Sequence, residues 1–134
     1  MARTVPALAG VVVAGALLAG CTPSAEPTVA TFLVAGGPQT YRIELATPEL
    51  IEHAKRLMAG EDLPSIPIGT IVRDDPSVNE PWSWHIDPAT LEFAEVTIEV
   101  CDGLPEYVED GTLTSPTYCP WLAEVVEITG PGAG

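Results

Sequence analysis

The amino-acid sequence predicts an α+β fold, in which a small antiparallel sheet of four to five strands packs on one face against one main helix at about residues 48–59. Two observations lead to this prediction. Short runs with the two-residue periodicity of half-buried strands lie on both sides of a single amphipathic helical run. These strands and helices do not alternate regularly, as they would in a doubly wound parallel sheet.

A hairpin is predicted first. The run TVATFLVA at residues 28–35 and the run QTYRIEL at residues 39–45 both have the composition of strands. In the second run, Tyr41, Ile43 and Leu45 share one face, while the residues between them are polar or charged. The segment GGP supplies turn residues, so we expect the two strands to pair.

The helix is predicted by its ends as well as by its periodicity. Thr47 can accept hydrogen bonds from the first free amide groups, and Pro48 suits the first helical position. Gly60 suits the end of the helix. His53 is expected on its exposed surface. The apolar face of the helix consists of Leu50, Ile51, Ala54, Leu57 and Met58.

The second half of the chain contains shorter elements. A strand is predicted at residues 68–73, and the run WSWHID at residues 82–87 has the pattern of another. The clearest strand is AEVTIEVC at residues 94–101. One helical turn is predicted at residues 105–110, and residues 119–128 close the domain. In the strand at 94–101, the residues predicted to face inward are Val96, Ile98 and Val100.

The N-terminal segment predicts export. Residues 1–20 join a positive charge at Arg3 to an apolar run too short to span a bilayer comfortably, as in a signal peptide. The run ends in LLAGC, which resembles a bacterial lipobox, so Cys21 is the predicted lipidation site, carrying acyl chains such as palmitate. An ordinary secretory signal and an uncleaved anchor are the alternatives. The other predicted parts are residues 21–29, the lipidated cysteine and a short tether; residues 30–129, one domain; and residues 130–134, a disordered tail.

The charge of the chain limits its partners. Every acidic residue follows Cys21, so loss of Arg3 with the signal changes the formal net charge from −14 to −15. Such a surface repels nucleic acid and anionic lipid headgroups, and neither is an expected partner. It can attract cations or a basic protein, although a soluble, self-repelling surface explains the same composition.

Two cysteines remain once Cys21 is lipidated, and they are Cys101 and Cys119. An even pair in an exported chain predicts a disulfide between them. The alternative is that one of the two stays free as a nucleophilic thiol beside a base.

Several stretches, taken in order, resemble a known family. They are ATPELIEHAKRLMAG, IPIGTIV, NEPWSWHIDPATLEFAEVTIEVCDGLPEYVED and CPW, and the match runs from about Phe32 to Trp121. Their order and spacing are similar to the N-terminal domain family named after a calmodulin-binding protein. The resemblance supports the fold and brings no catalytic motif. A chain with a lipobox would not meet calmodulin, and its acidity disfavours an acidic partner, so that role is not expected here.

The run WSWHID concentrates aromatic residues beside a histidine. Its tryptophans can serve as core anchors, with His85 as a hydrogen-bonded structural residue. The functional alternative makes Trp84, His85 and Asp87 the floor of a binding site, where His85, oriented by Asp87, acts as a general base or a metal ligand. Ser83 is then the candidate nucleophile of a hydrolase, although neighbours on one strand cannot reach triad geometry unaided.

A second candidate site lies in the loop RDDPSVNE. It offers oxygen ligands for calcium at Asp74, Asp75, Asn79 and Glu80, without the spacing of an EF-hand. A loop of turn and capping residues explains the same letters. A structural zinc site lacks its usual ligands, and no cofactor motif is present.

These observations predict a membrane-anchored, extracytoplasmic lipoprotein whose domain binds an envelope or secreted protein. No catalytic activity is predicted for this domain. Its contact surface is expected along the acidic residues 102–110 or the loop at 74–80. The alternatives are an extracytoplasmic hydrolase that uses His85 and a calcium-stabilised surface module.

Overall fold

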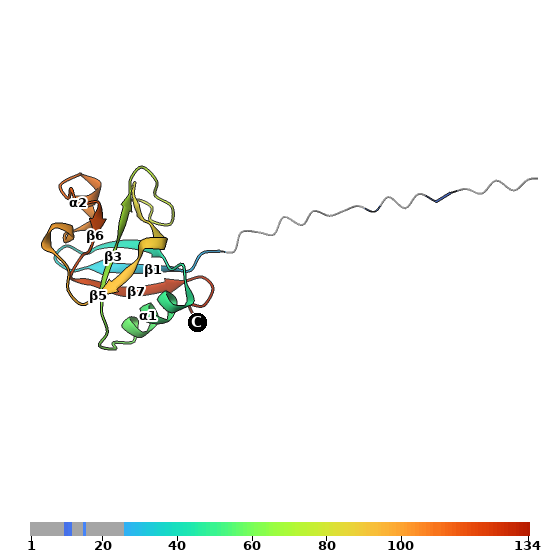
Figure 1. Cartoon of the computed structure of the whole chain (residues 1–134), viewed down its shortest axis with the longest axis horizontal. Helices are drawn as coiled ribbons and strands as arrows, with labels where there is room; N and C mark the ends of the chain where they lie inside the picture. Colours follow the sequence, from blue (N-terminus) through green and yellow to red (C-terminus); the bar gives the residue numbers. More distant parts are fainter. Residues whose placement is uncertain (1–9, 12–14, 16–25) are drawn as a thin grey trace, which may run out of the picture.

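The structure is a computed structural model that describes residues 10, 11, 15 and 26–134 (Figure 1). Cys21, the predicted lipidation site, lies outside these residues, as does most of the predicted signal peptide. Among the helices of the described residues, none has the length and apolar character needed to cross a membrane.

The fold begins with a three-stranded antiparallel sheet. Strands β1 (Val29–Val34) and β2 (Gln39–Glu44) form the predicted hairpin, and β7 (Ala123–Thr129) returns late in the chain to pair with β1. The strand order β2-β1-β7 leaves β7 at an edge of the sheet. The register pairs Phe32 with Tyr41, so the alternating apolar residues of the hairpin share one buried face.

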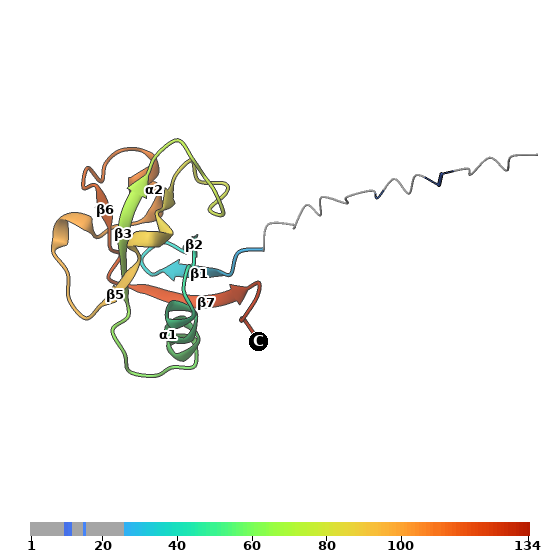
Figure 2. The same ribbon diagram turned by 45° about the vertical axis from the view of Figure 1, so that its right-hand side comes forward.

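One main helix, α1 (Pro48–Met58), packs against β7 and confirms the predicted helix (Figure 2). The Thr47 hydroxyl accepts a hydrogen bond from Leu50 N at 3.2 Å, as a capping residue should. Because Pro48 has no N–H, it begins the helix without leaving a donor unpaired.

His53 on this helix differs from its predicted surface position. Its ring stacks on Phe93 of the second sheet, with 4.6 Å between the ring centroids. Its Nε2 donates to the carbonyl oxygen of Pro64 at 2.7 Å. The histidine is therefore half-buried and joins the helix to the loop that follows it.

The second sheet is built around β3 (Ile66–Val72), which pairs antiparallel with three short strands. Strand β4 (His85–Ile86) pairs with the end of β3, β6 (Thr117–Tyr118) with its middle, and β5 (Glu92–Ala94) with its start. The remaining elements are the short 3-10 helices η1 (Pro88–Thr90) and η2 (Glu99–Cys101) and the helix α2 (Pro105–Glu109).

The α+β class, the antiparallel pairing and the single main helix are confirmed, but the strands are divided between two sheets rather than joined in one. Aromatic side chains connect the sheets. The Tyr41 ring centroid lies 5.2 Å from that of Tyr118 in β6 and 5.9 Å from that of Trp84, and the Phe32 centroid lies 6.3 Å from that of Phe93 in β5. Such pairs add about 0.5–1.5 kcal/mol each beyond the burial of their area, so side-chain packing holds the two sheets together.

The strand predicted at residues 94–101 is wrong beyond Ala94. The chain leaves the sheet there and turns through η2. Val96, Ile98 and Val100, which the alternation predicts to face inward, are 84%, 67% and 67% exposed. Cys101 is fully buried, and the turn that brings it inward leaves the apolar residues before it on the surface.

Two other segments differ from their predicted structure. Of the strand predicted at residues 82–87, only the two residues of β4 pair, because Trp82 N still donates within the preceding turn. Residues 130–134, predicted to be a disordered tail, make definite contacts, including a hydrogen bond from the Thr28 hydroxyl to the carbonyl oxygen of Pro131.

Candidate functional site

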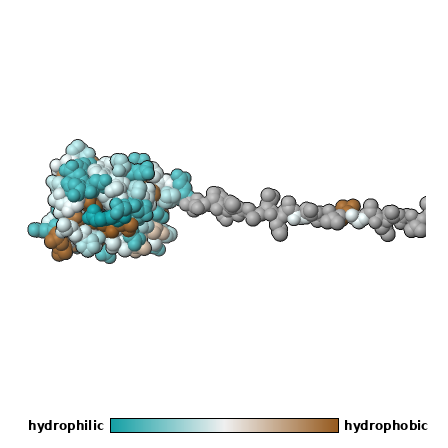
Figure 3. Space-filling view, turned by 90° about the horizontal axis from the view of Figure 1, so that it is seen from above, coloured by the Kyte–Doolittle hydropathy of each residue, from teal (hydrophilic) through white to brown (hydrophobic). Residues whose placement is uncertain are grey.

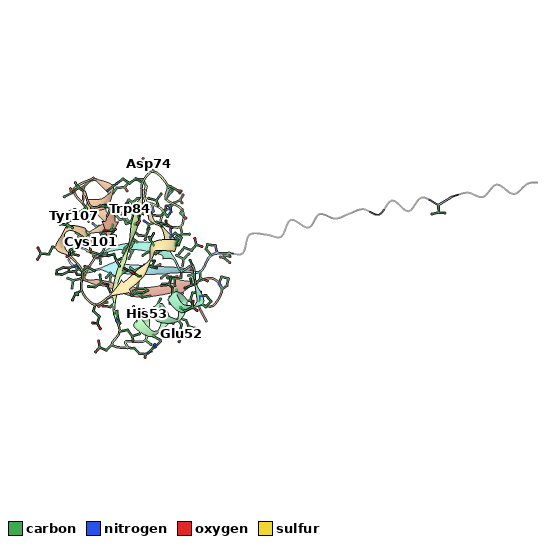
Figure 4. The ribbon with its side chains drawn as sticks, viewed as in Figure 1. Glu52, His53, Asp74, Trp84, Cys101 and Tyr107 are labelled. Atoms are coloured by element: carbon green, nitrogen blue, oxygen red, sulfur yellow. A yellow bond between two sulfur atoms is a disulfide. The ribbon has the colours of Figure 1, made fainter. Side chains whose placement is uncertain are left out.

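Trp84 lies in the core and not on the floor of an open site. Its side chain is 1% exposed and packs edge-on against Tyr118, with 5.6 Å between the ring centroids. Figure 4 shows it inside the domain, whereas Asp74 lies at the tip of the neighbouring loop. A ligand on the surface cannot contact this tryptophan without a rearrangement of the core.

His85 and Asp87 have separate partners. Nδ1 of His85 lies 2.6 Å from the carbonyl oxygen of Asp75, to which it donates. The Asp87 carboxylate accepts from Ala89 N at 3.0 Å and so caps η1. The predicted pairing of His85 with Asp87 is therefore not among the hydrogen bonds of the described residues, and binding at this position stays a prediction.

Ser83 also lacks the partner that a hydrolase would give it. Its hydroxyl donates to Glu109 Oε2 at 2.9 Å, and its N–H donates to the same oxygen at 3.0 Å. Because the serine is held by a carboxylate of α2 and His85 is held by another loop, these two residues do not form a nucleophile and base pair.

Asn79, one of the candidate calcium ligands, is a structural bridge. It is fully buried, and its side-chain oxygen accepts from Arg42 N at 2.7 Å. Its amide nitrogen donates to the carbonyl oxygen of Trp84 at 2.8 Å. Both ends of the amide are engaged, so the side chain joins β2 to the segment before β4 from inside the domain.

The other three candidate calcium ligands are not gathered into a metal site by themselves. Asp75 accepts from Ser77 N at 3.1 Å, and Asp74 and Glu80 belong to the same loop. Within residues 26–134, no three side chains of His, Cys, Asp or Glu lie close enough together to hold a metal ion. The hydrogen bonds of this loop are those of a turn, which is the alternative that its turn and capping residues also predicted.

The two buried tyrosines beside Trp84 allow a stability prediction. Tyr118 donates to the carbonyl oxygen of Gly103 at 2.8 Å, whereas the buried Tyr41 hydroxyl has no hydrogen-bond partner among the described residues. We expect Tyr118→Phe to lower the free energy of unfolding by about 1 kcal/mol, and Tyr41→Phe to leave it unchanged or raise it by up to about 1 kcal/mol. Urea unfolding at neutral pH measures the difference.

The same pair predicts the response to alkali. Burial raises the pKa of both tyrosines above the ordinary value of 10.0, because it disfavours the phenolate. A raised pKa gives stability that is fully present below pH 10 and is lost as the pH rises above it. Each Phe variant should therefore lose less stability than the wild type above pH 10. At neutral pH, a larger loss of unfolding free energy in Tyr41→Phe than in Tyr118→Phe would contradict the assignment of the hydrogen bond to Tyr118.

Cys101 and Cys119 form a disulfide, as predicted, with 5.0 Å between their Cα atoms. Both residues are fully buried, and Cys119 N donates to the carbonyl oxygen of Cys101 at 2.7 Å. Since neither sulfur is a free thiol, the alternative of a nucleophilic cysteine is wrong. The bridge fastens the loop before Cys101 to the segment that leads into β7.

Exposed apolar side chains gather on the two segments that the disulfide joins. Their exposed fractions range from 39% to 84%. The Trp121 main-chain N–H donates to the Asp102 carboxylate at 2.9 Å, and its ring N–H donates to the Thr97 hydroxyl, so both segments are held in place. In Figure 3 hydrophobic residues appear at the left end of the domain. We call this surface the apolar face, and it consists of Val96, Ile98, Val100, Trp121 and Leu122.

A groove runs beside the apolar face along the start of β7. It consists of two hollows of about 510 Å³ and about 430 Å³, which share Ser65, Trp121 and Leu122. We call it the β7 groove. The first hollow is also lined by Ala35, Leu57, Met58, Gly60, Glu61, Ala123, Glu124 and Val125, and the second by Ile66, Glu95, Val96 and Thr97.

The basic side chains of the domain form hydrogen bonds or ion pairs with other groups of the same domain. Among the described residues, Glu61 is the acidic side chain that pairs with a Lys or Arg side chain, at 3.0 Å from Arg56. The large excess of carboxylates is therefore not balanced from within. The other basic side chains donate to carbonyl oxygens: Arg42 to Glu80, Lys55 to Gly134, and Arg73 to Val108 and Leu113.

The sequence did not predict the apolar face or the β7 groove. The alternation of residues 94–101 predicts a strand with Val96, Ile98 and Val100 facing inward. A usable signal was present, since Cys101 has the opposite parity to Val96, Ile98 and Val100, and a regular strand places odd and even positions on opposite faces. A strand that buries Cys101 at its disulfide therefore cannot bury those three residues as well.

Comparison with known proteins places the chain in a family. The N-terminal domain family that the sequence motifs resemble matches residues 28–132, which include both sheets, α1, the disulfide and the β7 groove. The resemblance is therefore confirmed over nearly the whole domain. Comparison with curated proteins and with solved structures found no match. The chain belongs to the BP-74 N-terminal domain family.

Proposed function

We propose that the protein is a lipid-anchored, extracytoplasmic lipoprotein whose domain is a non-catalytic binding module and contacts a protein partner through the apolar face. One observation carries the proposal. Five apolar side chains stay 39–84% exposed on two segments that a buried disulfide joins. Three of them, Val96, Trp121 and Leu122, line one hollow. Exposed apolar surface that gathers in this way marks interaction sites in soluble domains.

The apolar face is a firm surface rather than a loose loop. The disulfide, the Cys119 N–H and the two Trp121 hydrogen bonds join residues 95–102 to residues 119–122. A partner that binds here would meet two segments that are already fastened to each other, which reduces the entropy lost on binding.

The position of this face also supports a partner outside the membrane. The chain enters the domain at residue 26 on one side, while the loop before Cys101 lies on the other side in Figures 1 and 2. An anchor at Cys21 would attach near the point of entry. The apolar face would then point away from the lipid that holds the protein.

The acidic segments that the sequence favoured as contact surfaces support the proposal less well. The carboxylates of Asp102, Glu109 and Asp110 accept hydrogen bonds from Trp121, Ser83 and Thr112 within the domain. Those of the loop at 74–80 are partly engaged as well, since Asp75 accepts from Ser77. We therefore assign the contact to the apolar face.

Site-specific photo-crosslinking in the intact cell tests this function. A benzoylphenylalanine in place of Ile98 is expected to give an adduct with an envelope protein, and unlabelled domain should compete it away. The matched control is Glu52 on α1, which lies far from Cys101 in Figure 4 and should give no such adduct. In the same experiment Cys21→Ser should release the chain from the membrane fraction.

Two results would overturn the proposal. One is the absence of a competed adduct at position 98, or an equal adduct at position 52, which would remove the apolar face as the contact. The other is a Cys21→Ser chain that stays with the membrane, which would remove the lipid anchor.

A further inference from the structure

We propose that the β7 groove binds an extended, lysine- or arginine-rich segment of a partner polypeptide, which adds as a strand to the edge of β7. This inference rests on the proposed function and names the chemical class of its partner. Three features of the groove support this inference. They are an open strand edge, apolar side chains beside that edge, and carboxylates on the walls of the groove.

The edge of β7 is open where the groove lies. Five consecutive residues, 121–125, line the first hollow. Three of them, 123–125, belong to β7, where side chains alternate, so all three line one hollow because it runs along the edge of the strand and exposes its main chain. β7 is an edge strand of its sheet, and the opposite wall of the hollow comes from the end of α1 and the loop that follows.

The register shows which main-chain groups face this edge. Ala35 N donates to the carbonyl oxygen of Leu122 at 3.1 Å, so the main chain of Leu122 points toward β1. In an antiparallel ladder this direction alternates, and Ala123 and Val125 therefore point away from β1, into the groove. Among the described residues no turn, loop or side chain makes a hydrogen bond to their main-chain groups. These groups match the main chain of an added strand.

The apolar side chains that a bound strand can contact lie where the two hollows meet. Trp121 and Leu122 line both hollows, and Val96 lines the second. A strand added to β7 presents every second side chain on one side. Apolar side chains at such spacing can rest on Trp121, Leu122 and Val96, and the intervening side chains point to the rim.

The charges on the rim favour a cationic segment. Glu124 lines the first hollow and Glu95 the second, and neither pairs with a Lys or Arg side chain among the described residues. A second copy of the chain is a poor occupant, because it would bring an equal formal charge of about −15 to the same carboxylates. Anionic lipid is disfavoured for the same reason.

Binding of synthetic peptides to the full chain in phosphatidylcholine nanodiscs tests the inference, with fluorescence anisotropy as the readout. The probe is a fluorescent nonapeptide that alternates Lys and Val. Three matched probes alternate Glu and Val, alternate Lys and Ser, or keep Lys and Val with every second amide N-methylated. Each matched probe should bind at least tenfold more weakly, because it lacks the positive charge, the apolar side chains or the main-chain N–H donors. Empty nanodiscs measure binding to lipid.

Variants of the chain locate the site. Leu122→Ser should weaken the Lys/Val probe at least tenfold, whereas Val126→Ser, an exposed valine of β7 that lines neither hollow, should not. Circular dichroism checks that both variants are folded. The inference is overturned if the Lys/Val probe does not bind, if any of the three matched probes binds equally well, if both variants behave alike, or if empty nanodiscs account for the signal. Crosslinking at position 98 that persists in any of these cases would leave the proposed function standing and remove only the strand-addition mode.

Discussion

Asn79→Ala is expected to lower the free energy of unfolding by about 3 kcal/mol, because it removes a buried amide that serves two main-chain groups at once. The amide is fully buried. It accepts from Arg42 N at 2.7 Å and donates to the Trp84 carbonyl oxygen at 2.8 Å. Each of those groups would be left without a partner, at a cost of about 1–3 kcal/mol each.

Urea denaturation of the disulfide-bonded protein, followed by tryptophan fluorescence, measures this loss. Asp75→Ala is the control from the same loop, since it removes one hydrogen bond at an exposed side chain and should cost less than about 1 kcal/mol. Asn79→Asp keeps an acceptor for Arg42 but faces Trp84 with a second acceptor, so it should destabilise the fold at least as much as alanine. A change of less than about 0.5 kcal/mol in Asn79→Ala would show that the bridge is not needed.

Replacement of both bridged cysteines, Cys101→Ala with Cys119→Ala, is expected to cost about 3 kcal/mol. The disulfide closes a loop with a sequence separation of 18 residues, and loss of that closure returns conformational freedom to the unfolded chain. Alanine is chosen because both sites are fully buried, where a serine hydroxyl would need a partner. Chemical denaturation of the variant and of the wild type, oxidised and reduced, measures the effect.

Intact mass provides the companion measurement for the disulfide. The oxidised domain should gain the mass of two hydrogens on reduction, and the double variant should not. Hydrogen exchange should also speed up in residues 95–101 of the variant, because the loop is then held by fewer contacts. Equal stability of the oxidised and reduced wild type would contradict the expected role of the bridge.

The parts of the fold that the sequence predicted correctly are those set by local chemistry. The hairpin follows from alternating residues around a Gly-Gly-Pro turn, and α1 begins at Pro48 beside a Thr47 cap. The disulfide follows from an even pair of cysteines in a chain expected to be exported. In each case the residues that decide the outcome either lie within a few positions of each other or have only one possible partner.

The candidate site could not be predicted in the same way. Residues 94–101 have the pattern of a strand, but the burial of Cys101 against Cys119 turns them outward. His85 could have been oriented by Asp87, two residues away, but a loop ten residues earlier supplies its partner through the carbonyl oxygen of Asp75. These outcomes depend on which distant segment arrives beside a side chain.

The sequence by itself therefore determined the α+β class, the one main helix, the family and the pairing of the cysteines, together with a strongly acidic composition. Only the tertiary structure decided that the strands divide into two sheets, that Asn79 joins β2 to the segment before β4 from inside the domain, and that β7 is an edge strand beside the β7 groove. The physical reason is that periodicity tells which residues share a face, while packing between distant segments decides whether that face meets the core or the solvent.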